Sequence, residues 1–236
     1  MTTPQPLSSL VGQGGLELEV AYCVGGVVSP LLANIALHVL DAEWTRGGRS
    51  LGVLIRYCDD FVILCRTRPQ AEQARRLVAE ILATLGLHLH PDKTRIVGLT
   101  KGRQGFDFLG FHHHKVESWR WRGRYYLQRW PATRAMNAIR AATDRRFGGH
   151  CLAWIVANLN RVLRGWGAYF RHGNSARKFA DIDSYVHERL AIFASTKHGL
   201  RYHRNWTRRF TWAWRQGLGV YRLSGRVRSG AAHALR

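Results

Sequence analysis

The sequence predicts an α+β protein whose first half mixes short strands with helices and whose second half is helical and strongly basic. Three observations predict this fold class. Two apolar runs, at residues 53–57 and 61–65, flank a pair of acids, which is the pattern of a β-hairpin. From Pro131 onward, apolar residues recur at helical spacing. The excess positive charge lies almost wholly beyond residue 117.

The distribution of charge along the chain is more informative than the net charge. The 236 residues carry a net charge of +21, and residues 1–117 hold 12 basic and 11 acidic side chains, whereas residues 118–236 hold 24 basic and 4 acidic ones. Arginine supplies 31 of the 36 basic residues, and its guanidinium forks onto phosphate and stacks on bases. The sequence therefore predicts a neutral half joined to a half that binds a polyanion, with nucleic acid as the first candidate.

Composition excludes several other classes. A hydrophobic content of 46% is enough for a packed core and argues against disorder throughout the chain. No apolar run is long enough to cross a bilayer and the N-terminus has no signal-peptide pattern, so we expect a cytoplasmic protein without a membrane partner. The four cysteines form no C-x-x-C pair, which argues against a zinc site or a disulfide framework.

The first expected element is a helix that begins near Ser29 and Pro30. Before it, residues 1–24 hold a stretch rich in Ser, Thr, Gly, Pro and Gln, and we expect them to form a mobile leader. Ser29 can cap the helix and Pro30 suits its first turn. Apolar residues continue at roughly helical spacing to Trp44, and Gly47-Gly48 ends the segment.

The hairpin follows, with strands at 53–57 and 61–65 around the turn Cys58-Asp59-Asp60. Pro69 starts an amphipathic helix that Gly86 is well placed to end. Short strands are then expected at 87–89, 95–97, 106–111 and 125–127.

Beyond a domain boundary near residue 130 the sequence predicts helices only. They are expected at about 132–146, 151–170, 179–195 and 202–216, with arginines and aromatics alternating throughout. The last stretch, 217–236, is basic and contains glycine, so we expect a loosely ordered tail.

The acid pair Asp59-Asp60 is the strongest candidate for chemistry. Two carboxylates between apolar strands are costly in a core but suit a hairpin tip that holds divalent metal. Phosphoryl transfer between nucleotides uses two metal ions about 4 Å apart, and Mg²⁺ takes only a few protein carboxylates. The alternative is a polar turn with solvated acids.

A second candidate is the segment 118–130, where aromatic residues alternate with Arg120, Arg122, Arg124 and Arg129. Aromatic rings can stack on unpaired bases while arginines neutralise phosphate; the alternative is an amphipathic hairpin with a solvated basic face. The same choice applies to Arg161, Arg164 and Arg171 on an expected helix, whose Trp166 and Tyr169 we assign to the core. Three consecutive histidines at 112–114 alternate between the faces of a strand, so they cannot converge on one metal ion.

Several of these segments resemble the reverse transcriptases of group II introns. Tyr57–Asp60 (YCDD) is similar to their Tyr-x-Asp-Asp signature, with Cys58 where alanine is usual. The segment 25–35 (GGVVSPLLANI) resembles the preceding motif, 85–97 (LGLHLHPDKTRIV) the next palm motif, and 108–111 (FLGF) the primer-grip hairpin. They occur in the family's order. The segment 159–170 (LNRVLRGWGAYF), followed by FADID at 179–183, resembles the maturase, or thumb, domain.

The resemblance implies a partial reverse transcriptase palm at 25–130 and a maturase-specific, thumb-like domain with a basic tail at 131–236. It implies that Asp59 and Asp60 are catalytic ligands of Mg²⁺ and that Tyr57 lies at the nucleotide site. Gly25 and Gly26 either permit close approach of the nucleic acid or only form a turn. Lys93 is either a charge near the incoming triphosphate or a solvated loop lysine.

The family carries fingers and a third catalytic aspartate before its Gly-Gly motif. Here the acids before Asp41 are only Glu17 and Glu19, and Cys23-Val24 replaces the usual Pro-Gln. We therefore expect an incomplete two-metal site and no polymerase activity from this chain alone.

Three hypotheses follow. The first is a truncated reverse transcriptase/maturase that binds intron RNA, with DNA as a further target or primer. The second is an RNA-directed DNA polymerase that is active only with an upstream fingers/palm chain as partner. The third is a decayed fragment of a mobile element.

Overall fold

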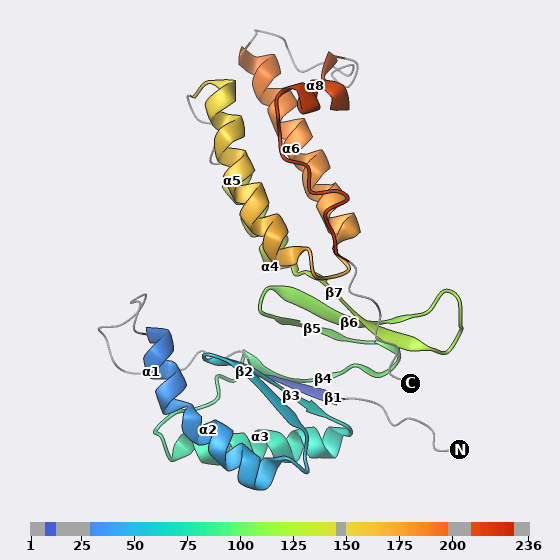
Figure 1. The fold of residues 1–236 in the computed structure, drawn as a ribbon. Helices are drawn as coiled ribbons and strands as arrows, with labels where there is room; N and C mark the ends of the chain where they lie inside the picture. The colour runs from blue at the N-terminus through green and yellow to red at the C-terminus, as the bar shows by residue number, and fades with distance from the viewer. Residues whose placement is uncertain (1–7, 13–28, 145–149, 198–208, 229–236) are drawn as a thin grey trace. The chain divides into compact units, whose positions relative to one another are not determined.

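The computed structural model describes residues 8–12, 29–144, 150–197 and 209–228. The chain divides into two compact units (Figure 1), the first comprising Met1–Leu109 and His113–Leu127 and the second Gly110–His112 and Gln128–Arg236. The first mixes helices and strands and the second is mainly helical, which confirms the predicted α+β class. The main division, between Leu127 and Gln128, lies close to the boundary expected near residue 130.

The first unit is built on a four-stranded antiparallel sheet with the order β2-β3-β1-β4. Its strands are β1 (Ser8–Gly12), β2 (Val53–Tyr57), β3 (Asp60–Cys65) and β4 (Thr94–Gly98). Tyr57 pairs with Asp60, and Gly12 pairs with Phe61 on one side and Thr94 on the other. Strands β2 and β3 form the hairpin that the sequence predicts, and this hairpin makes up one side of the sheet.

Strand β1 lies within the segment that was expected to be a mobile leader, and that expectation is wrong for residues 8–12. The strand pairs along its whole length with both β3 and β4. Pairing on both sides satisfies backbone groups that the local composition alone would leave to water, so contacts distant in sequence decide the structure here. Residues 1–7 and 13–24 of the expected leader lie outside the described residues.

Helices α2 (His38–Glu43) and α3 (Arg68–Ala83) pack on one face of this sheet. Helix α1 (Ser29–Ala36) precedes α2, and the π-helical turn η1 (Trp44–Gly48) follows it. The expected single helix is thus interrupted at Leu37. Thr67 caps α3 in a reciprocal pair with Gln70. Buried Phe61, Ile63 and Cys65 of β3 share a core with α2 and α3.

The strand expected at 87–89 does not form; this segment is a loop that places buried Leu87 in the same core. The strand expected at 106–111 is divided by a turn at Leu109-Gly110, where both residues have positive φ. The result is a second sheet in the order β5-β6-β7, with β5 (Gly105–Phe108), β6 (Phe111–Glu117) and β7 (Tyr125–Pro131), preceded by the short turn η2 (Thr100–Gly102). Phe106 packs with Val62, Val97 and Leu99 in a separate small core.

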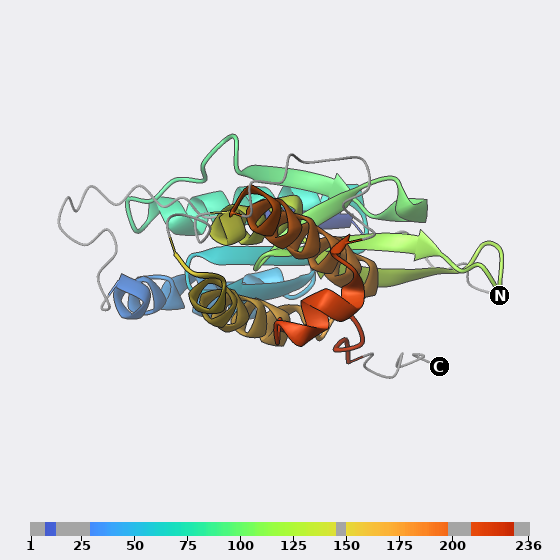
Figure 2. The ribbon, with the colours of Figure 1, turned by 90° about the horizontal axis from the view of Figure 1, so that it is seen from above.

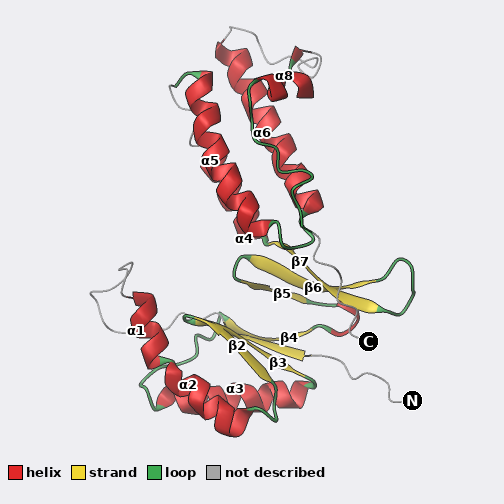
Figure 3. Ribbon diagram, in the orientation of Figure 1, coloured by secondary structure: helices red, strands yellow, loops and turns green. Residues whose placement is uncertain are grey.

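In the second unit, every regular element described after Pro131 is a helix (Figure 3). They are α4 (Thr133–Asp144), α5 (Leu152–Phe170), α6 (Ala176–Lys197) and α8 (Trp212–Gly217). Figures 1 and 2 show α5 and α6 running side by side, with α8 beside them, and α4 contacts both long helices. Of the helix expected at 202–216, residues 202–208 lie outside the described residues, and α8 begins only at Trp212.

Leucine, isoleucine and phenylalanine side chains of α5 and α6 form the core of this unit with Val220 and Leu223 from the segment after α8. Of the expected tail, residues 217–228 are described and 218–228 return along the helices, whereas 229–236 lie outside the described residues. Within the described part of the chain, we find no helix with the length and apolarity that a membrane crossing needs.

Candidate nucleic-acid and metal sites

The acid pair lies at the tip of the β2–β3 hairpin, as predicted. The connecting loop is shorter than expected: it consists of Cys58 and Asp59, and Asp60 is already the first residue of β3. Cys58 has a φ of 53°, a backbone conformation that two-residue hairpin loops require. Asp59 is exposed and Asp60 is half-buried.

Arg56 of β2 fixes this loop. Its guanidinium donates to the carbonyl oxygen of Cys58 (2.8 Å) and to Oδ1 of Asn34 on α1 (2.9 Å). It also donates to both carboxylate oxygens of Asp41 on α2, with 3.0 Å from Nε to Oδ1. The hydrogen bond to Asp41 raises the pKa of Arg56. No local sequence pattern indicates this cluster, because Asp41 and Asn34 lie 15 and 22 residues from Arg56.

Other predicted residues reach the same edge of the sheet. Tyr57 ends β2, opposite Asp60, and its side chain is 62% exposed. Lys93 is exposed in the turn just before β4, whose first residue pairs with Gly12. The topology therefore brings the acid pair, Tyr57 and Lys93 to one edge. Gly25 and Gly26 lie outside the described residues.

The donor set at this edge does not match a two-metal centre. Asp59 and Asp60 are adjacent in sequence, one in the loop and one in the strand. In the described part of the chain no group of three or more His, Cys, Asp or Glu side chains could hold a metal ion. After β1 the sequence continues Gln13-Gly14-Gly15, and its next acids are Glu17 and Glu19, which lie outside the described residues. Two carboxylates without a third among the described residues would leave Mg²⁺ poorly oriented.

The predicted arginines Arg120, Arg122 and Arg124 lie in the loop that joins β6 to β7, and all three are exposed. The guanidinium carbons of Arg120 and Arg124 lie 5.6 Å and 5.5 Å from the ring centroid of Trp121. Such cation–π contacts hold the charges in place without neutralising them.

Arg129, by contrast, has a structural role in the second unit. Its guanidinium donates to the carbonyl oxygen of His172 at 2.8 Å and 3.1 Å, and its backbone exchanges hydrogen bonds with Asn174. These bonds tie β7 to the turn between α5 and α6, so we assign Arg129 to the scaffold.

The three arginines predicted around α5 differ from one another. Arg161 and Arg164 are exposed, and Arg164 lies over the ring of Tyr221 at 4.9 Å. Arg171 is half-buried just after the helix and donates from Nε to Nε2 of His172 (3.1 Å). Trp166 and Tyr169 of α5 were expected to lie in the core. Trp166 packs against the core as expected. Tyr169 does not, because it is 52% exposed, although its ring contacts Phe170.

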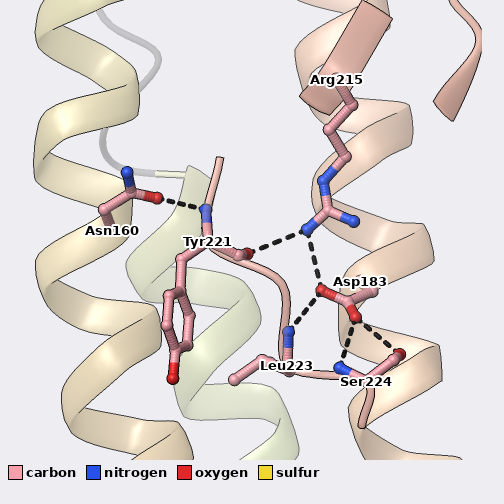
Figure 4. Close-up of polar contacts among 6 residues, drawn as sticks. All are labelled: Asn160, Asp183, Arg215, Tyr221, Leu223 and Ser224. Atoms are coloured by element: carbon pink, nitrogen blue, oxygen red, sulfur yellow. Dashed lines mark hydrogen bonds and ion pairs between the residues drawn. The ribbon is translucent and has the colours of Figure 1, made fainter. Parts of the chain in front are cut away.

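A buried ion pair orders the segment after α8 (Figure 4). Asp183 on α6 and Arg215 on α8 are 1% and 2% exposed, and their side chains meet at 2.8 Å. Asp183 also accepts hydrogen bonds from the backbone N–H groups of Leu223 (3.1 Å) and Ser224 (2.8 Å) and from the Ser224 hydroxyl (2.7 Å). Burial by itself would raise the pKa of Asp183, but these donors outweigh it and the pKa is lowered.

The same segment is held from α5. The side chain of Asn160 accepts from the backbone N–H of Tyr221 (2.6 Å) and donates to the carbonyl oxygen of Gly219 (2.9 Å). Gly167 lacks a side chain where Leu223 packs, and a Cβ there would lie 2.6 Å from Leu223 Cδ2. We call residues 218–228 the strap. It carries three exposed arginines over the helices, namely Arg222, Arg226 and Arg228.

An antiparallel sheet with an acid-tipped hairpin, followed by a helical unit rich in arginine, is the arrangement expected of a polymerase-type palm with an appended helical domain. Residues 11–113 match the family "Reverse transcriptase (RNA-dependent DNA polymerase)" and residues 132–214 match "Group II intron, maturase-specific domain". Together the two matches show that the chain belongs to the group II intron reverse transcriptase/maturase family. No curated protein matches the chain. Reverse transcriptases in general use Mg²⁺.

Proposed function

We propose that this chain binds intron RNA through its arginine-rich surfaces and assists splicing as a maturase. The observation that carries the proposal is the charge of residues 118–236, which hold 24 basic and 4 acidic side chains. RNA presents a phosphate at every nucleotide, and a surface with this excess attracts it over a long range.

The acids of this half do little to offset the excess at the surface. Of its four acids, Asp183 is buried against Arg215, and Asp144 lies 2.9 Å from Arg189 and accepts a hydrogen bond from Tyr185. Only Asp181 and Glu188 are exposed, against 24 basic residues in this half. The exposed arginines of α5, the strap and the β6–β7 loop are therefore the groups that phosphates would meet. Arginine suits this role because its planar fork can bind a phosphate through two hydrogen bonds.

The first unit contributes in another way under this proposal. Its acid pair does not make a two-metal centre from the described residues, so we assign no DNA synthesis to this chain acting alone. The sheet, with Tyr57 and Lys93 at its edge, would serve as a scaffold against which an RNA or a primer lies.

The experiment is a binding and splicing assay on a structured group II intron RNA. The chain should retain this RNA on a filter in preference to an equal mass of duplex DNA. It should also accelerate splicing at a magnesium concentration too low for efficient self-splicing. A chain that binds the intron no better than it binds duplex DNA, and leaves splicing unchanged, would contradict the proposal and favour a decayed element.

A second candidate is RNA-directed DNA synthesis in complex with a chain that supplies fingers and the missing carboxylate. The acid-tipped hairpin within the reverse transcriptase match at 11–113 favours it. Primer extension on an RNA template, with and without an added upstream fingers/palm fragment, tests this candidate. Activity that needs the fragment and disappears in Asp59→Ala would support it, whereas extension by the chain alone would contradict our assignment.

A further inference from the structure

The loop between β6 and β7, residues 118–124, is held in a defined shape by its own hydrogen bonds. The backbone N–H of Ser118 donates to the carbonyl oxygen of Arg124 (2.7 Å), and the N–H of Arg124 donates to that of Trp121 (3.2 Å). The N–H of Gly123, which has a φ of 80°, donates to the Glu117 carboxylate (2.7 Å). Figure 1 shows this loop extending beyond the paired part of the two strands.

Its two tryptophans have different surroundings. Trp121 is 56% exposed and has the guanidinium groups of Arg120 and Arg124 over its ring. Trp119 is 91% exposed, more than any other large hydrophobic side chain in the described part of the chain. Trp121 therefore positions the arginines, and Trp119 presents its ring to solvent.

A tryptophan ring in water forgoes the hydrophobic stabilisation that burial would give. Its neighbours indicate what would cover it: Arg120, Arg122 and Arg124 are all exposed within five residues, and residues 118–131 contain no acid. The three guanidinium groups outnumber the one acid that adjoins the loop in sequence, Glu117, whose carboxylate accepts from the Gly123 N–H. An aromatic face beside this excess of positive charge suits a base whose adjoining phosphates meet the charges.

The base must be unpaired. Inside a duplex both faces of a base are already stacked, so a protruding indole ring can reach only a base in a single strand, a bulge or a loop. A duplex would meet the arginines and not the ring.

We propose that Trp119 stacks on an unpaired base of the bound RNA while Arg120, Arg122 and Arg124 contact the flanking phosphates. This inference rests on the proposed RNA-binding function and names the part of the RNA that this loop recognises.

The test uses the full chain and two RNAs of equal length, a stem with an eight-nucleotide loop containing 2-aminopurine and a fully paired duplex. Trp119→Ala should weaken binding to the looped RNA about tenfold, within the range for loss of one stacked base, and leave duplex affinity within about twofold. It should also abolish the 2-aminopurine quenching that wild type causes. Trp119→Phe should keep most of the affinity for the looped RNA and most of the quenching. Because Trp119 is exposed, none of these variants should change the melting temperature.

Trp154→Ala is the matched control, because Trp154 is an exposed tryptophan (43%) on α5 and does not belong to the loop 118–124. It should behave as wild type on both RNAs. If wild type binds RNA but Trp119→Ala binds the looped RNA equally tightly, or loses the same affinity for both RNAs, the Trp119 inference is overturned and the proposed function stands. If Trp119→Ala instead loses only binding to anionic lipid vesicles, the ring serves a membrane and the inference fails. If wild type binds neither RNA, the proposed function itself fails.

Discussion

The chain uses carboxylates in two opposite ways in its two units. At the hairpin tip of the first unit, Asp59 is exposed and Asp60 is half-buried. Arg56 holds their loop through a hydrogen bond to the carbonyl oxygen of Cys58. In the second unit, Asp183 is almost fully buried, and four donors from Arg215, Leu223 and Ser224 converge on its two oxygens.

The difference separates the acids that can meet a ligand from the acid that shapes the fold. A carboxylate saturated by buried donors has no capacity left for a metal or a substrate, and its contribution is to conformation. An exposed pair contributes little to stability but remains open to other molecules. Substitutions at these acids and their partners test this division.

Asp183→Ala should cause the largest loss of stability. It leaves Arg215 buried without its carboxylate and removes the partners of the strap, which should cost about 3–5 kcal/mol. Urea denaturation of the full chain, followed by circular dichroism, measures it. Asp181→Ala, an exposed position on the same helix, is the control and should stay within about 0.5 kcal/mol of wild type. Equal effects of the two substitutions would remove the basis for the comparison.

Arg56→Ala should be the most destabilising change near the acid pair, at about 2 kcal/mol, because one charged donor serves Asp41, Asn34 and the Cys58 carbonyl. The same denaturation experiment applies. Arg46→Ala removes an exposed ion pair with Glu43 and should change stability by less than about 0.5 kcal/mol. If Arg56→Ala left the free energy of unfolding unchanged, the loop would keep its shape without the Arg56 hydrogen bonds.

The ion pair also predicts a response to pH. The pKa of Asp183 is lower in the folded chain than in the unfolded one, so its contribution to stability is complete above a pH of about 5. On further acidification the unfolded chain takes up the proton first, and stability falls as the pH drops through the folded value. Asp183→Asn, which carries no charge, should lose less stability than wild type between about pH 5 and pH 2. A variant with the wild-type slope would assign the acid sensitivity to other carboxylates.

The smallest effects concern RNA. Replacing both Arg161 and Arg164 by alanine should weaken binding to intron RNA about threefold to tenfold. It should also make the slope of log affinity against log salt concentration shallower, by the amount expected for about two lost phosphate contacts. Asp59→Ala removes a negative charge from the other unit and should leave RNA affinity unchanged or slightly higher. Filter binding at two salt concentrations distinguishes the double arginine variant from Asp59→Ala. Weaker binding by Asp59→Ala would mean that the acid pair takes part in holding RNA.

Local patterns were sufficient for much of the fold. The apolar runs around Asp59-Asp60 predicted β2 and β3, and helical spacing predicted α3, α4, α5 and α6 with ends displaced by a few residues. Strand β1 was missed because Ser8–Gly12 is short and lies in a segment of turn-forming residues. Its structure comes from pairing with β3 and β4, which lie about 50 and 80 residues further along the chain.

The candidate sites could be predicted only where their residues are contiguous in sequence. The YCDD motif and the alternation of arginine and tryptophan at 118–124 are contiguous, so the sequence alone indicated them. The partners of Arg56 and Asp183 could not, since Asp41 lies 15 residues from Arg56 and Ser224 lies 41 residues from Asp183. Asp183 does close the FADID segment that resembles the maturase domain, but nothing local indicates that it meets Arg215.

The most direct test of the account is the affinity of the unmodified chain for a structured group II intron RNA across a salt titration from about 50 to about 200 mM. Arginines that neutralise several phosphates release as many counterions, so the logarithm of the association constant should fall linearly with the logarithm of salt concentration, losing at least about tenfold over this range. An affinity that stays constant across the titration would contradict the claim that the arginine-rich surfaces of this chain bind RNA.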